Sequence, residues 1–586
     1  MKHILKKTIL FLLTLSIGFS SCKKETDSPD ETDNPTVPIT GNSITTSIGG
    51  QIIDENGNAV IAATVSVGSN SMQSNAQGFF LFENITVNEY KAYVKVEKSG
   101  FFVGSRSIAS KSNTINSIRI KLLSNSIVGN FQSTTGGIVS YSGVSLSFPN
   151  NGIKFESGGL YSGTVNVALQ FLDPTTPDMI DRMPGDLSGI DNNGDQTALE
   201  TYGMIAVELT SPSGQKLNVA DGKKVEIKIP LSGAYLSDAP ATIPLWYFDE
   251  VNGTWKEEGL ATKVGNEYVG EVSHFTFWNF DWPNPATFIS GNLTCNATAL
   301  AGATVIVKTT SGRMMGATIS DNLGNYTLRV PQSVVLEMEV SPAGACNLIP
   351  IYSATIGSFT SVSVIPTISS CAGSVNSAII TATLQDCAGN PVTNGVLQIK
   401  NGSHTSNFYP NSSGVISGSL VYCSASSVNV IAHDFGNLKS SVPQSVSTGA
   451  TMNLGTISIC SNPTNEFINY NLDGTAYSML NAPGDSLNIY SYVSSNSTQI
   501  SCFSASTMDA IFMDFVGRSV GTYNLAGINC QNLRANGTGV AMTINISAYG
   551  TTIGSFISGS FSGTFVDISA STTHNLTGNF NLKRNN

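Results

Sequence analysis

Short runs of β-branched and aromatic residues dominate the chain from residue 44 onward, and glycine, asparagine and aspartate separate them. Runs of this kind are typical of strands joined by tight turns. Long segments with an apolar residue at every third or fourth position, which would indicate amphipathic helices, are lacking. The sequence therefore predicts an all-β protein.

The composition points to several exported domains. The chain has 586 residues, of which only 12% are charged, against about 25% in an average soluble domain. This length suits several domains rather than one. The formal net charge is −11, and no basic cluster follows the first few residues. Nucleic acid is therefore not expected as a partner.

The N-terminus has the pattern of a secretory signal. Lys2, Lys6 and Lys7 precede an apolar run over residues 8–19, and two serines lead to Cys22. A basic start, a short apolar run and small residues define a signal peptide, here residues 1–21. The apolar run is shorter than the roughly 20 residues that span a bilayer as a helix.

The cysteine after these small residues resembles a bacterial lipobox. The resemblance implies that the Cys22 thiol is acylated and becomes the new N-terminus; ordinary secretion with a chance cysteine is the alternative. Residues 22–43 are acidic and contain proline, so they are expected to form a flexible tether. The acidic run 25–33 resembles the surface-export signals of Bacteroidetes lipoproteins, or is a solvated spacer. The implied location is the outer membrane, at its outer face.

Residues 44–124 form the first predicted unit. Asp54 and Gly57 mark one turn, Gly78 marks a second, and Gly100-Phe101 follows a third strand. This order resembles the carboxypeptidase regulatory-like domain, a small prealbumin-like β-sandwich. The resemblance concerns the accessory domain alone, because no histidine of the chain is followed by a zinc-binding glutamate at the required spacing. Neither a metal nor another cofactor is expected.

The same pattern recurs twice, over residues 287–371 and 372–460. Each copy places a cysteine near its start and its end, namely Cys295 with Cys371 and Cys387 with Cys460. An even cysteine count in an exported chain indicates disulfides. Residues 461–586 form a last β unit, in which Cys502 and Cys530 are the only cysteines and are predicted to pair.

Residues 125–286 differ from the repeats, because their last third contains all four tryptophans of the protein. Exposed indole rings would form a platform on which sugar rings stack. Large residues at alternate strand positions would equally form a core. Core packing is favoured, and both interpretations concern Trp246, Trp255, Trp278 and Trp282.

The same block resembles, distantly, the ZU5-type sandwich. Some members of that family cut themselves at His-Phe-Ser, and the matching residues here are His274, Phe275 and Thr276. The resemblance implies that the Thr276 hydroxyl attacks the Phe275 carbonyl with His274 as base. An ordinary strand with Phe275 inward is the alternative. Self-cleavage predicts two bands from one gene product, and Thr276→Ala should abolish the second band.

Oxygen-rich side chains gather between Asp191 and Asp195. They could suit a calcium ion, but their spacing is not that of an EF-hand, and the same residues form ordinary turns. A polar loop is the favoured interpretation.

Together these features predict a non-enzymatic cell-surface lipoprotein, an array of β-sandwiches with a binding or adhesive role. One alternative is a carbohydrate-binding component of a surface glycan-uptake system. A second alternative is a self-cleaving surface protein. The predicted partners are the membrane, through the lipid anchor, and glycans or other surface proteins.

Overall fold

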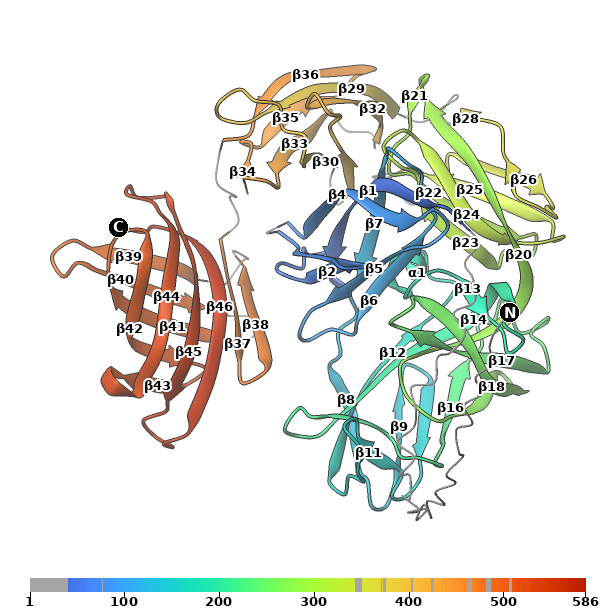
Figure 1. The fold of residues 1–586 in the computed structure, drawn as a ribbon, viewed down its shortest axis with the longest axis horizontal. Helices are drawn as coiled ribbons and strands as arrows, with labels where there is room; N and C mark the ends of the chain where they lie inside the picture. The colour runs from blue at the N-terminus through green and yellow to red at the C-terminus, as the bar shows by residue number, and fades with distance from the viewer. Residues whose placement is uncertain are drawn as a thin grey trace, which may run out of the picture. The chain divides into compact units, whose positions relative to one another are not determined.

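The computed structural model describes residues 41–586, except residues 76, 343–349, 370, 372–375, 402–403, 423–425, 438, 461–465, 481–485 and 505–507. The signal peptide, Cys22 and nearly all of the tether lie outside the described residues. Strands make up nearly all of the regular secondary structure of the described chain, together with one α-helical turn, α1 (Met179–Arg182), and one 3-10 turn, η2 (Gly537–Gly539). The all-β prediction is confirmed (Figure 1). Within the described ranges, no helix is long and apolar enough to cross a membrane.

The first repeat consists of two sheets that enclose an apolar core. In one sheet, β1 (Ser43–Ile53) lies between β4 (Phe79–Asn88), which is antiparallel to it, and β7 (Ile115–Lys121), which is parallel. The other sheet has the order β3 (Asn70–Gln73), β2 (Thr64–Val67), β5 (Ala92–Glu97), β6 (Gly104–Ile108). Alternate residues of both sheets point inward, as in a β-sandwich.

This arrangement occurs three times. In the second copy the first sheet contains the end of β20 (Phe277–Cys295), β24 (Asn325–Pro331), β27 (Ser363–Val364) and β28 (Ile368–Ser369), and the second contains β22 (Thr304–Thr309), β23 (Met314–Ile319), β25 (Leu336–Ser341) and β26 (Tyr352–Gly357). In the third copy the sheets contain β29 (Asn376–Gln385), β32 (Val415–Tyr422) and β36 (Thr451–Ser458), and β30 (Gly395–Asn401), β31 (His404–Phe408), β33 (Ser427–Asp434), β34 (Lys439–Ser440) and β35 (Gln444–Ser447). In each copy the first and last strands run parallel.

One glycine position explains why the copies share this form. Gly78, Gly324 and Gly414 have φ angles of 74°, 78° and 74°. A Cβ atom at these positions would lie 2.3, 2.3 and 2.7 Å from a carbonyl oxygen of the first strand of the same copy. Only glycine permits both this backbone conformation and this close approach. The turn before the second strand of the first sheet is therefore specified by sequence in all three copies.

Residues 127–285 form a closed barrel between the first and second repeats in sequence. Hydrogen bonds run in the order β8 (Ile127–Gln132), β12 (Thr164–Leu172), β14 (Gln196–Thr210), β20, β17 (Thr242–Asp249), β18 (Thr254–Val264), β19 (Glu267–Val272), β16 (Val225–Pro230), β10 (Val144–Phe148), β9 (Gly137–Tyr141). A bridge between Gln132 and Gly136 brings β9 back to β8. The block is therefore a barrel rather than a sandwich of two open sheets.

Strand β20 belongs to two units. Its first half pairs with β14 and β17 of the barrel, and its second half pairs with β24 of the second repeat. The predicted boundary between residues 286 and 287 therefore falls inside a continuous strand. A strand that passes between two sheets leaves no turn signal, so the sequence could not place this boundary.

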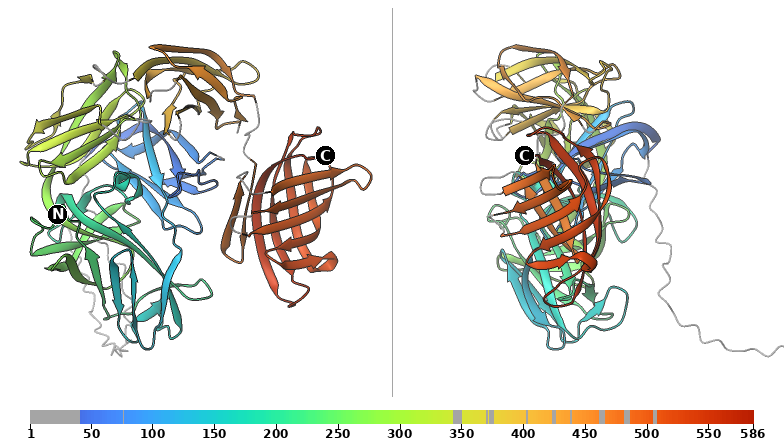
Figure 2. Two further views of the ribbon diagram at one scale, coloured as in Figure 1. Left: turned by 180° about the vertical axis from the view of Figure 1, so that it is seen from behind. Right: turned by 90° about the vertical axis from the view of Figure 1, so that its left-hand side faces the viewer.

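The last unit is one large sheet that surrounds its own core. Its strands follow the order β38 (Thr475–Leu480), β37 (Phe467–Leu472), β46 (Thr573–Lys583), β45 (Phe556–Val566), β44 (Val540–Tyr549), β42 (Gly521–Cys530), β41 (Ala510–Val516), β40 (Ser497–Phe503), β39 (Ser486–Tyr492), with β43 (Leu533–Asn536) beside β42. Figure 2 shows the curvature of this sheet from two sides. Strand β46 pairs on both sides, with β37 and with β45.

The six cysteines that the structure describes divide into three classes. Cys295 and Cys371 form a disulfide at the end where the parallel strands of the second repeat meet. Cys387 and Cys460 occupy the corresponding end of the third repeat as exposed free thiols. They are close neighbours, and the hydrogen bond between them raises the pKa of Cys460.

The predicted pairing of Cys502 with Cys530 is wrong. Both are free, buried thiols, and Ile511 of the intervening strand pairs with each of them. Two strand spacings place the two Cα atoms about 10 Å apart, beyond the roughly 7 Å that a disulfide can bridge. Burial raises the pKa of each thiol to about 12.

Candidate functional site

The tryptophans occupy two different environments. Trp246, Trp255 and Trp278 are 0% exposed, whereas Trp282 is 44% exposed. A sugar can stack only on a ring face that is open to solvent, so the four rings do not form the alternative platform. Core packing, the favoured interpretation, holds for three of the four.

The buried indoles lie on both sides of the barrel wall. Trp278 packs inside the barrel, whereas Trp246 and Trp255 pack outside it with Phe248. Each ring N–H donates to a backbone carbonyl oxygen, at 3.1 Å from Trp246 to Asp281, 2.9 Å from Trp255 to Asp186 and 2.9 Å from Trp278 to His274. The polar atom of each buried ring is therefore satisfied.

The outer tryptophans belong to a junction of three units. Their apolar cluster contains residues of the first repeat, the barrel and the second repeat. We call it the junction cluster: Phe102, Leu123, Ala168, Leu172, Met179, Ile180, Met183, Leu187, Leu199, Met204, Ala206, Trp246, Phe248, Trp255, Phe277 and Met314. A shared core of this size is typical of units that move together.

The β17–β18 hairpin contacts the first repeat. Gly253 takes a φ of 64° in the turn of this hairpin. Tyr93 of β5 covers Gly253, where an added Cβ would lie 2.2 Å from the ring, and its hydroxyl donates to the Glu250 carbonyl at 3.0 Å. Ser107 of β6 donates to the Gly253 carbonyl at 2.9 Å.

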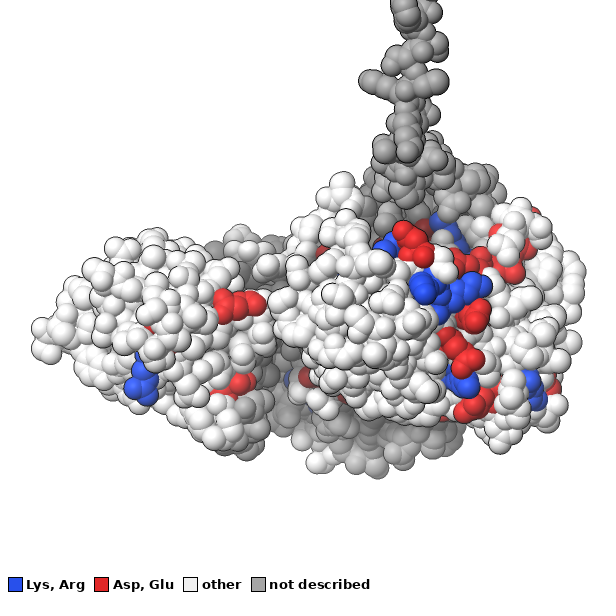
Figure 3. Space-filling model, turned by 90° about the horizontal axis from the view of Figure 1, so that it is seen from below, with Lys and Arg blue, Asp and Glu red and all other residues white. Residues whose placement is uncertain are grey.

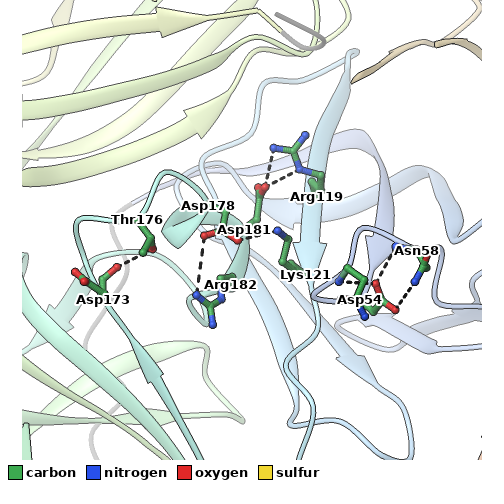
Figure 4. Close-up of polar contacts among 10 residues, drawn as sticks. Asp54, Asn58, Arg119, Lys121, Asp173, Thr176, Asp178, Asp181 and Arg182 are labelled. Carbon is green, nitrogen blue, oxygen red and sulfur yellow. Dashed lines mark hydrogen bonds and ion pairs between the residues drawn. The ribbon is translucent and has the colours of Figure 1, made fainter. Parts of the chain in front are cut away.

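Ion pairs also join the first repeat to the segment around α1 (Figure 4). Arg119 and Lys121 of β7 reach Asp181 and Asp178, each at 2.7 Å. Asp181 lies in α1 and is 5% exposed, and its charge raises the pKa of Arg119. The partners are about 60 residues apart in sequence, which is why no local pattern predicted these pairs.

The barrel meets the second repeat through two arginines. Arg313 pairs with Glu200 of β14 and with Asp238. Arg329 of β24 donates to Gln196 at 3.0 Å, and its guanidinium carbon lies 4.7 Å from the Phe288 ring centre. The junction is therefore held by apolar, hydrogen-bonded and ionic contacts together.

A small pocket opens where the three units meet. Tyr90 and Ser107 line it from the first repeat, Asp186 from the barrel, and Phe288 and Arg329 from β20 and β24. The rings of Tyr90 and Phe288 stack at 4.2 Å. Burial lowers the pKa of Arg329, and Asp186 offsets this effect in part. Among the described residues, no group of three or more His, Cys, Asp or Glu side chains could hold a metal ion.

The predicted self-cleavage residues lie in the bend between β19 and β20. Phe275 is 8% exposed, and the Thr276 hydroxyl donates to the Phe277 carbonyl oxygen at 3.1 Å. The His274 ring lies 3.3 Å from the Glu258 carboxylate. In this conformation the hydroxyl and the imidazole have partners other than each other.

The loop from Asp191 to Asp195 has the geometry of a turn. The Asp191 carboxylate accepts from the backbone N–H groups of Asn193 at 2.9 Å and Asp195 at 2.8 Å. Gly194 has a φ of 87°. The Asp191 side chain thus stabilises the loop itself, as expected for a polar turn.

We expect the contact between the first and third repeats to weaken at acidic pH. His433 is 2% exposed, lies 5.8 Å from the Phe79 ring and bonds Ser440 at 2.9 Å. Burial lowers its pKa to about 4, and Lys400 adds to the effect. The unfolded chain, with a histidine pKa of about 6.5, therefore takes up a proton before the folded chain does. Stability should fall as the pH drops from about 6.5 to about 4.

Urea unfolding at pH 7 and at pH 4.5 tests this expectation. The third repeat should lose about 2–3 kcal/mol between these values, from a pKa difference of roughly two units. His433→Gln, which cannot be protonated, should remove most of this dependence. An equal loss in both proteins would assign the pH effect to other groups.

Known proteins resemble only part of this chain. No protein-family model matches the chain. A segment of 122 residues is 30% identical to human cartilage intermediate layer protein 2, covering 21% of this chain and 10% of that protein. A segment of 115 residues is 30% identical to pig cartilage intermediate layer protein 1, covering 20% of this chain and 19% of that protein. The chain thus spans between a tenth and a fifth of these relatives.

Several solved bacterial structures align loosely with the chain. The shaft pilin spaA of Lactobacillus rhamnosus GG aligns with a TM-score of 0.15 and 9% identity, covering 30% of this chain and 98% of the pilin. The Bacillus anthracis TIE protein aligns with a TM-score of 0.14 and 12% identity, and the alignment covers 78% of this chain and 72% of that protein. The architecture described above rests on the strand pairing of this chain alone.

Proposed function

We propose that the chain is a non-enzymatic lipoprotein of the cell surface that acts as a β-sandwich scaffold. The junction cluster carries this proposal, because it joins the first repeat, the barrel and the second repeat through one continuous core. Units joined in this way hold a fixed geometry, which suits a protein that presents a distal surface to a partner. The lipobox resemblance at Cys22 supplies the anchor.

Metabolic labelling with an alkyne-tagged fatty acid tests the anchor. The full chain, produced in a Bacteroidetes host, should incorporate the label and sediment with the outer membrane. Cys22→Ser should abolish both, whereas Cys387→Ser, which removes an exposed thiol elsewhere, should change neither. Protease added to intact cells should degrade the chain.

Absence of label from the unchanged chain would contradict lipidation. Protection from protease in intact cells, with degradation after lysis, would contradict surface exposure. Of the four tryptophans in the alternative glycan platform at residues 246–282, only Trp282 has a ring that is exposed to solvent. A carbohydrate-binding role for this chain would therefore need another surface.

A further inference from the structure

The outer face of strands β39 to β41 carries aromatic side chains. Along each strand the inward residues Leu487, Ile489, Ile500, Ile511 and Met513 are buried in the core of the last unit. A sheet face in contact with water normally carries polar residues at the alternate positions. Here those positions include four aromatic residues, Tyr490, Tyr492, Phe503 and Phe512.

The strand register places complementary groups in one row. Tyr490 pairs with Gln499, Gln499 with Asp514, and Asp514 with Gly527. The row therefore runs from an aromatic ring through an amide to a carboxylate, across about 10 Å for two strand spacings. This is the length of a disaccharide.

A glycine at the end of the row makes room for the carboxylate. A Cβ atom on Gly527 would lie 2.7 Å from Asp514 Oδ1. Within the described part of the chain, Asp514 and Gln499 make no hydrogen bond or ion pair through their side chains. Partial burial raises the pKa of Asp514. Both groups are therefore available to a ligand.

Aromatic rings flank the row on both sides. Tyr492 is 39% exposed and lies two residues from Tyr490 on β39, with ring centres 6.4 Å apart. Phe512 lies two residues from Asp514 on the other side of the row. Phe503 lies one row beyond Phe512 and is 39% exposed.

The face is nearly free of charge. Residues 461–586 include six acidic and four basic residues, and Asp514 is the one charged member of the row. In Figure 3, which shows one face of the molecule, charged side chains gather at the right and are few at the left. An ionic partner would find little complementary charge here. A neutral pyranose offers an apolar face for stacking and hydroxyl groups for the amide and the carboxylate.

We propose that Tyr490, Tyr492, Gln499 and Asp514 form a binding face for a neutral polysaccharide. Tyr490 and Tyr492 stack on successive sugar rings. The Gln499 amide donates to or accepts from the sugar hydroxyl groups, and the Asp514 carboxylate accepts from them. This face is distinct from the tryptophan cluster and does not depend on the lipid anchor. Its failure would leave the scaffold proposal intact.

Isothermal titration of the purified full chain tests the proposal, with cellohexaose, xylohexaose, mannohexaose and maltohexaose as probes. At least one should bind saturably. Tyr490→Ala and Asp514→Asn should each weaken that binding at least tenfold, with unchanged circular dichroism. Tyr141→Ala is the matched control, because Tyr141 is 43% exposed on the barrel and should leave the affinity unchanged.

Three results would overturn the proposal. The first is that none of the four hexasaccharides binds the folded chain. The second is that binding persists in both Tyr490→Ala and Asp514→Asn. The third is that the chain self-associates through this face and that Tyr490→Ala abolishes this association. The last result would assign the face to a second copy of the chain.

Discussion

Replacing Trp278 with alanine is expected to destabilise the barrel by about 3–5 kcal/mol, the usual cost of emptying a buried tryptophan site. The ring is 0% exposed and packs among the apolar residues inside the barrel. Its N–H also satisfies the His274 carbonyl oxygen. Urea unfolding followed by tryptophan fluorescence measures this loss, because all four tryptophans lie in residues 246–282 and report on the barrel.

Trp282→Ala is the matched control on the same strand. Its ring is 44% exposed, so the change should alter the free energy of unfolding by no more than about 0.5 kcal/mol. Equal losses in the two variants would contradict the assignment of Trp278 to the core and Trp282 to the surface.

Removing the Cys295–Cys371 disulfide is expected to cost the second repeat about 2–5 kcal/mol. The bond closes a loop across a sequence separation of 76 residues, and cross-links of this span restrict the unfolded chain strongly. It also joins the ends of two parallel strands at the margin of the repeat. Cys371→Ser should therefore lower the urea midpoint of this unit.

Reductant provides the control for this prediction. In a Cys387→Ser background, which prevents Cys387 and Cys460 from pairing, dithiothreitol should lower the midpoint by the same amount as Cys371→Ser. The Cys371→Ser protein should then be insensitive to dithiothreitol. A reductant effect that persists in that protein would place the stabilising bond elsewhere.

Local patterns predicted the features that depend on neighbouring residues. Large residues at alternate strand positions predicted core packing, and Trp246 and Phe248, two residues apart on β17, are both buried in the junction cluster. The sequence also predicted the turns at Gly57 and Gly78, and both residues have positive φ angles. These features follow from strand geometry, in which successive side chains point to opposite faces.

Contacts between distant segments could not be predicted in this way. The error over Cys502 and Cys530 arose because cysteine count carries no information on strand order, and β41 lies between the two strands. The row of Tyr490, Gln499 and Asp514 was not predicted for the same reason. Each residue is ordinary within its own strand, and only the register of three strands brings them together.

The sequence alone determined the all-β class, the turns and the threefold recurrence of one pattern, because strand alternation and glycine backbone conformations are local properties. Tertiary structure decided that residues 127–285 close into a barrel, that β20 serves two units, and that three tryptophans are buried. It also decided which aromatic residues remain exposed. These outcomes depend on which strands pair and which faces meet, and both are set by the packing of segments that are far apart in the chain.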